Sequence, residues 1–108
     1  MTVTQAIAYL DETTPNRYSP EQKRLWLRTV ESAAAAVLGI EPPADGEELL
    51  LGQGYDAAYL RYMEAQIRYH DGMESASRHA MEAYEKAMAA FARAHQRENL
   101  PERGGKFL

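Results

Sequence analysis

The chain contains no cysteine, only one tryptophan, and no long apolar run. Without cysteine there are no disulfides and no thiolate ligands for a metal. A membrane-spanning helix needs roughly 20 consecutive apolar residues, and no stretch approaches that length. Residues 1–5 also lack the basic start and apolar core of a signal peptide. We therefore expect a protein that is made and kept inside a cell, with no membrane contact.

Cations are scarce as well. The chain carries 12 Lys and Arg against 16 Asp and Glu, which gives a net charge of −4 and a pI near 5.3. Tight binding to nucleic acid depends on cations that displace counterions from phosphates, so a DNA-binding helix-turn-helix protein is a poor candidate. The length of 108 residues, with 45% hydrophobic and 26% charged residues, fits one ordinary globular domain.

Helical periodicity and start signals predict an all-α domain resembling a four-helix bundle. Thr2 and Gln5 form a capping-box pattern, and Ser19 precedes a proline at the first helical position. Gly39 stands where a left-handed residue commonly ends a helix, and Asp56 stands where it can cap the third helix. The predicted helices span residues 3–12, 20–38, 56–70 and 73–97.

Two segments fall outside the helical pattern. Residues 40–54 are rich in proline, glycine and acidic residues, and Leu49–Leu51 within them is either a short strand or an anchored loop. A loop of this length is more often functional or mobile than idle. Residues 99–108 contain two adjacent glycines and end in two large apolar side chains. We therefore expect a single helical domain over 1–98 and a flexible C-terminal docking arm over 99–108.

The last predicted helix carries a heptad seam in which residues recur at steps of four and three. The seam consists of Met73, Ser77, Ala80, Tyr84, Ala87, Phe91 and Ala94. Such a seam pairs helices between two subunits or packs inside one subunit. It favours, as an alternative function, a small dimeric helical regulatory or protein-binding module.

No catalytic constellation is evident. His70, His79 and His95 lack the spacing of a helical metal site, and Gly52–Gly54 is too short to hold a phosphate. No serine stands in a nucleophile elbow, and no nucleophile, base and oxyanion donor can be named together. We expect no enzyme activity, no cofactor and no metal.

Four tyrosines align in helical steps on the third predicted helix. Aromatic residues at this spacing are usually core, but tyrosine is also favoured where two surfaces meet, because its ring is apolar and its hydroxyl still seeks a partner. The charged face of the second helix is a solvated or an intersubunit face. The candidate subunit-interface residues are Tyr55, Tyr59, Tyr62, Tyr69, Arg24 and Arg28.

Several motifs together resemble those of one family. They are Pro15-Asn16-Arg17-Tyr18-Ser19 leading through Lys23 to Trp26-Leu27, then Leu50-Leu51, then Tyr55 through Ile67 with the run Tyr-Leu-Arg-Tyr-Met-Glu-Ala-Gln-Ile, and then Tyr69, Gly72 and the segment 97–101. In this order the chain resembles the head–tail connector (adaptor, or head-completion) proteins of tailed bacteriophages of the siphophage type and of prophages. The resemblance covers almost the whole chain.

The chain departs from the family pattern at three places. Gly52–Gly54 occupies a stretch where relatives carry a β-hairpin and prolines. Met73 intervenes between Gly72 and Glu74, where relatives place an acidic residue directly after the glycine. Ser75–Ser77 replaces an asparagine-rich start of the last helix. These departures affect two expectations: that a β-hairpin precedes the third helix, and how the third and fourth helices are arranged as a helical hairpin.

The resemblance implies a structural virion protein. Its subunits would form a dodecameric ring under the portal protein after assembly in the host cytoplasm, extending the DNA channel and presenting a platform for a stopper or tail-completion protein. DNA would pass without specific binding. The arm residues that would dock on the portal or on an adjacent subunit are Arg103, Lys106, Phe107 and Leu108.

Overall fold

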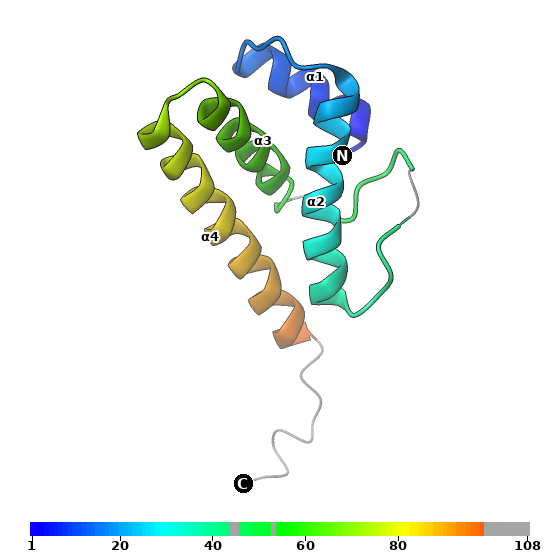
Figure 1. The fold of residues 1–108 in the computed structure, drawn as a ribbon. Coiled ribbons are helices and arrows are strands. Elements are labelled where there is room, and N and C mark those ends of the chain that lie inside the picture. The colour runs from blue at the N-terminus through cyan, green and yellow to red at the C-terminus, as the bar shows by residue number, and fades with distance from the viewer. Residues whose placement is uncertain (44–45, 53, 99–108) are drawn as a thin grey trace, which may run out of the picture.

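The computed structural model describes residues 1–43, 46–52 and 54–98 and contains four α-helices in that part of the chain (Figure 1). Within one residue at each end, these are the helices that the sequence predicts. They are α1 (Val3–Thr13), α2 (Pro20–Leu38), α3 (Ala57–His70) and α4 (Glu74–Glu98). The fold class expected from the sequence is confirmed.

The boundaries of α1 and α2 follow from local side chains. Thr2 accepts a hydrogen bond from the backbone N–H of Gln5, and the Gln5 side chain accepts one from the N–H of Thr2, so the capping box is complete. At the start of α2 the Ser19 hydroxyl accepts from Gln22 N–H at 3.1 Å. Gly39 ends α2 with φ at +70°, a conformation that only glycine adopts without strain.

The start of α3 differs from the prediction in one respect. Asp56 occupies the expected position, but it is already helical at φ −65° and ψ −19°, and its side chain makes no capping hydrogen bond. A tight turn provides the start instead, because the N–H of Tyr55 donates to the carbonyl of Gly52 and the N–H of Ala58 donates to that of Tyr55. The first turn of α3 therefore continues from a preceding turn, with no side-chain cap.

Three helices and one loop share the core. Its large side chains with almost no exposed surface are Leu10, Leu27, Val30, Leu51, Tyr59, Met63 and Ile67. Burying a side chain of this size contributes about 1.5–3 kcal/mol relative to leaving it in water. Leu51 is the one member of this set that comes from a loop, so the segment after α2 belongs to the core as much as the helices do.

The segment Gly46–Gly52, here called the strap, is an anchored loop and contains no strand within its described residues. A single antiparallel bridge links Thr2 with Glu48, where Val3 N–H donates to the Glu47 carbonyl at 2.8 Å. In the same place Leu49 N–H donates to the Met1 carbonyl at 3.2 Å. The question that the sequence left open is thereby decided in favour of an anchored loop.

Helix α4 packs mainly on α3, to which a tight turn at Gly72 connects it (Figure 1). From Ser77 onward the heptad seam faces α3 inside the subunit: Ser77 and Ala80 are buried, and the Ser77 hydroxyl donates to the Ala65 carbonyl at 2.8 Å, whereas Met73 at the start of the seam is 47% exposed. From Met81 to Arg97 none of the described side chains is buried. The second half of α4 is therefore only partly covered by its own subunit.

Candidate functional site

The structure separates the four tyrosines of the predicted interface. Tyr59 has no exposed surface. Tyr62 stacks edge-on against Tyr84 with ring centroids 5.1 Å apart, and Tyr55 does the same with Phe91 at 5.5 Å, so both rings contribute to the α3–α4 contact. Burial raises the pKa of Tyr84, and the neighbouring Tyr62 and Glu85 raise it further. Of the four, only Tyr69 is largely exposed, at 62%.

Tyr59 belongs to a buried hydrogen-bonded cluster, here called the clasp, that also contains the Glu31 carboxylate and the N–H groups of Leu50 and Leu51. The sequence did not predict this cluster. The Tyr59 hydroxyl donates to the Glu31 carboxylate on α2 and accepts from Leu51 N–H at 2.8 Å. Glu31 is only 7% exposed and also accepts from Leu50 N–H, at 2.9 and 3.2 Å to its two oxygens. Burial, then the hydrogen bond and charge of Glu31, raise the pKa of Tyr59 well above its ordinary range.

The clasp fixes the strap because it satisfies two backbone N–H groups that would otherwise be buried without an acceptor. An unsatisfied buried donor costs about 1–3 kcal/mol. The one available signal was Glu31 itself, a charged residue that follows Val30 on the buried side of α2. Charged residues are seldom fully buried unless they are paired. Nothing in the helical pattern, however, indicates that its partners lie 19 and 28 residues away.

A second network fixes the turn between α1 and α2. The Lys23 ammonium lies 2.6 Å from an Asp11 oxygen, and Lys23 is 4% exposed. Asn16 donates to the same Asp11 oxygen at 3.0 Å and accepts from Tyr18 N–H at 3.1 Å. Burial acts to raise the pKa of Asp11, but the hydrogen bonds from Lys23 and Asn16 and the Lys23 charge outweigh it, so the pKa is lowered.

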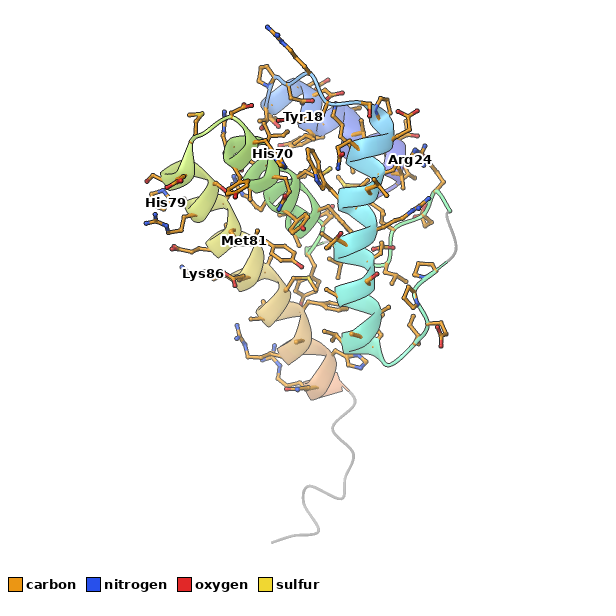
Figure 2. All side chains as sticks on the ribbon, in the orientation of Figure 1. Tyr18, Arg24, His70, His79, Met81 and Lys86 are labelled. Atoms are coloured by element: carbon orange, nitrogen blue, oxygen red, sulfur yellow. The ribbon has the colours of Figure 1, made fainter. Side chains whose placement is uncertain are left out.

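Aromatic and apolar side chains collect where the α1–α2 and α3–α4 turns meet. Tyr18 stacks edge-on against Trp26 at 5.2 Å, and His70 lies nearly parallel to Trp26 at 6.4 Å (Figure 2). The Tyr69 ring lies edge-on to His70 with ring centroids 5.5 Å apart and is 62% exposed, and Met73, which follows the α3–α4 turn, is 47% exposed. We call Tyr18, Tyr69, His70, Met73 and Arg17 the end patch. Tyrosine, methionine and arginine are enriched in protein–protein interfaces.

The two arginines of the predicted interface lie elsewhere. Arg24 and Arg28 line a small cleft of about 110 Å³ between α2 and the loop that follows it, together with Pro42 and Leu49. Arg24 is 3.9 Å from a Glu47 oxygen, in an exposed pair that contributes little to stability. In Figure 2 Arg24 and His70 are well separated. The structure therefore places Arg24 and Tyr69 on different surfaces.

Glu47 has a further role beside this cleft. Its carboxylate accepts from Thr4 N–H at 3.0 Å, where the exposed first turn of α1 offers unpaired donors. The hydrogen bonds from Thr4 lower the pKa of Glu47, with a smaller contribution from Arg24. Glu47 thereby connects the strap to the start of α1.

Arg103, Lys106, Phe107 and Leu108 lie outside the described residues. Within residues 1–43, 46–52 and 54–98, no three His, Asp or Glu side chains are placed to share a metal ion. No helix in the described part of the chain is long and apolar enough to cross a membrane.

The residues that carry the family resemblance mostly hold the fold together. Asn16 and Lys23 build the first turn, Leu51 and Tyr59 form the clasp, and Trp26 packs beneath the end patch. Searches of protein-family models, curated proteins and solved structures each find no match to this chain.

Proposed function

We propose that this chain is a structural subunit of a phage head–tail connector. It would form a ring between the portal protein and a stopper or tail protein and extend the DNA channel. The observation that carries the proposal is the end patch, in which Tyr69 and Met73 are about half exposed or more. Side chains of this kind are costly to leave in water and typical of a surface that another protein covers.

The interior supports the same proposal. The specialised polar residues Glu31, Tyr59, Asp11 and Lys23 all take part in hydrogen bonds that hold backbone segments in place. A subunit that works by geometry needs a rigid shape in which the turns and the strap are fixed. The buried networks supply that rigidity.

The overall charge suits a channel. The chain carries a net charge of −4, so a ring of copies repels the phosphate backbone of DNA and does not grip it. Sliding DNA requires such weak contact. This property also sets the proposal apart from a DNA-binding regulator.

The alternative function, a dimeric regulatory module, depended on the heptad seam of α4. That seam packs against α3 within the subunit, where Ser77, Ala80 and the Tyr62–Tyr84 pair lie. The outward face of α4 carries Lys86, Arg93 and Arg97 instead of an apolar stripe. The described contacts of α4 therefore favour packing inside one subunit over an α4–α4 dimer.

The proposal predicts binding to portal rings. Wild-type subunits should co-sediment with rings of the cognate portal protein, and a truncation that lacks residues 101–108 should keep its helical circular dichroism yet lose the portal. A Tyr69→Ser, Met73→Ser variant tests the end patch, with Tyr9→Ser as the control, because Tyr9 is 50% exposed on α1 outside the end patch. If the truncated protein still co-sedimented with portal rings, residues 101–108 would not be needed for docking. If the wild-type protein did not bind portal rings, the connector function would be refuted.

A further inference from the structure

The second half of α4 carries positive charge that no described residue of its own subunit neutralises. Lys86, Arg93 and Arg97 are exposed, and none of them forms an ion pair with a residue that the structure describes. Their spacings of seven and four residues place the three side chains along one side of the helix. We call these three residues the basic stripe. It extends over about 16 Å of the helix.

No acidic residue interrupts the basic stripe. The nearest carboxylates along the chain are Glu82 and Glu85, which precede Lys86, and Glu98, which follows Arg97. Neither Glu82 nor Glu85 forms an ion pair with a cation in the described part of the chain. Figure 2 shows the labelled Lys86 on the side of α4 that faces away from α2. A negative partner for the stripe would therefore come from another molecule.

Small side chains lie beside the basic stripe. Three alanines repeat its spacing at positions three residues earlier in the chain, so they form a second row parallel to the stripe. They are Ala83, Ala90 and Ala94, and all three are half-buried. On the other side of the stripe Ala89 is exposed. Because a methyl group projects little, a second helix can approach α4 at the short end of the usual distance of about 8–10 Å between helix axes.

This half of α4 is also the part that its own subunit covers least. Ser77 and Ala80 are buried against α3, whereas no described side chain from Met81 to Arg97 is buried. The helical backbone bonds its own N–H and C=O groups, so a partner cannot add to it as a strand and has to contact side chains. A row of charges beside a row of methyl groups matches the regular side-chain rows of another helix.

From these observations we infer that the second half of α4 is a docking surface for an acidic α-helix of another protein. In an antiparallel arrangement, carboxylates four and then seven residues apart on that helix would meet Arg97, Arg93 and Lys86 in turn. Small side chains next to those carboxylates would pack on the alanine row. Such pairing of opposite charges sets register and partner choice more than it adds affinity.

This surface is separate from the end patch. The end patch lies at the α3–α4 turn, and the basic stripe lies toward the other end of α4 (Figure 1). The surface would therefore serve a partner other than the one that covers the end patch. The inference does not depend on the connector function.

The basic stripe is less suited to nucleic acid. Proteins that hold duplex DNA tightly by its phosphates use many cationic contacts, whereas the stripe offers three cations on a chain of net charge −4. The alanine row gains nothing from contact with phosphates. Charge and apolar surface together favour a protein helix with carboxylates over DNA.

A labelled peptide tests the docking surface by fluorescence anisotropy. The probe is a helical peptide of about 20 residues with Glu at spacings of four and seven along one side and with Ala and Leu beside them. A peptide of the same composition in scrambled order keeps the net charge and loses the row. The wild-type protein should bind the ordered peptide at least about tenfold more tightly than the scrambled one, because only the ordered peptide pairs with all three cations.

Two variants locate the binding on α4. Arg93→Gln, Arg97→Gln should weaken binding of the ordered peptide about tenfold. Arg61→Gln, Arg78→Gln removes two exposed positive charges elsewhere and should leave the affinity within about twofold. Arg93→Glu, Arg97→Glu should lose the ordered peptide and bind instead a version in which Lys replaces each Glu. Circular dichroism checks that each variant keeps its helices.

The other outcomes overturn the inference. Equal weakening in the Arg61→Gln, Arg78→Gln control, or equal binding of the scrambled peptide, would mean that only overall charge matters. Failure of the wild-type protein to bind the ordered peptide would refute the docking surface. A duplex DNA of about 20 base pairs is titrated in parallel. DNA binding that Arg93→Gln, Arg97→Gln abolishes, without peptide binding, would assign the stripe to nucleic acid.

Discussion

At the scale of single residues, the clasp is the feature on which most of the strap depends. Glu31 and Tyr59 come from different helices, and together they accept the N–H groups of Leu50 and Leu51. Replacing either side chain leaves at least one buried polar group without its partner. Leaving a buried polar group without a partner lowers the free energy of unfolding by more than a typical hydrogen bond adds to it.

The clasp predicts a difference between two tyrosines. Tyr59→Phe should lower the free energy of unfolding by about 2–3 kcal/mol, because Glu31 loses its O–H donor and Leu51 N–H loses its acceptor. Tyr62→Phe is the matched control, since Tyr62 packs through its ring on Tyr84 and no hydrogen bond of its hydroxyl is seen within the described residues. Urea denaturation measures both, and equal midpoints for the two variants would contradict the clasp.

Asp11 predicts a dependence of stability on pH. Its pKa in the folded protein lies below the ordinary 3.8. A carboxyl with a lowered folded pKa stabilises the protein above its unfolded pKa, and this contribution is lost as the pH falls through the folded value. Asp11→Asn should therefore be less stable than the wild type by about 1 kcal/mol at neutral pH, the side chain being 47% exposed.

In the same comparison the difference should narrow as the pH falls below 3.8 and vanish once the wild-type carboxyl is protonated in the folded protein as well. Glu12→Gln is the control, since Glu12 is the exposed neighbour and makes no ion pair with a described residue. It should match the wild type at every pH compared. A stability gap for Asp11→Asn that stays constant from pH 7 to pH 3 would show that the charge of Asp11 has no role.

At the scale of helices and loops, glycine conformation decides where α2 ends. Gly39 adopts φ +70°, while no atom lies within 4 Å of the position where a β-carbon would be. Gly39→Ala should therefore cost only the backbone strain, about 1–2 kcal/mol. Gly52→Ala is the control, since Gly52 has ordinary φ and equally open surroundings, and its melting temperature should match the wild type. An equal fall in melting temperature for Gly39→Ala and Gly52→Ala would argue against a role for the left-handed conformation of Gly39.

The helices could be predicted from the sequence because their signals are local. Thr2, Ser19 and Gly39 each act on backbone groups within a few residues, so the capping bonds can be read from neighbours in the chain. At Asp56 the same reasoning found the position but not the cause, because a turn from Gly52 already supplies the first helical bonds.

The clasp and the end patch were less predictable from the sequence, because both depend on packing between segments that are distant in the chain. Helical spacing aligned four tyrosines, but it could not say that Tyr59 turns toward Glu31 while Tyr69 faces water. Which side of a helix is buried is set by the neighbouring helices and by the strap.

At the scale of the whole molecule, shape and charge act together. One end of the bundle carries the end patch, and the exposed face of α4 carries Lys86, Arg93 and Arg97. A subunit in a ring needs three such surfaces: two for its neighbours and one for the structure on which the ring sits. An isolated regulatory dimer needs only one self-complementary surface.

This difference predicts how the mass in solution depends on concentration. Head-to-tail contacts leave an open surface at each end, so the average mass of a 12.2 kDa chain should rise past twice the monomer mass without a plateau at the dimer. Light scattering over a dilution series measures this dependence, and a stable plateau at the dimer mass would favour a symmetric contact in place of the ring.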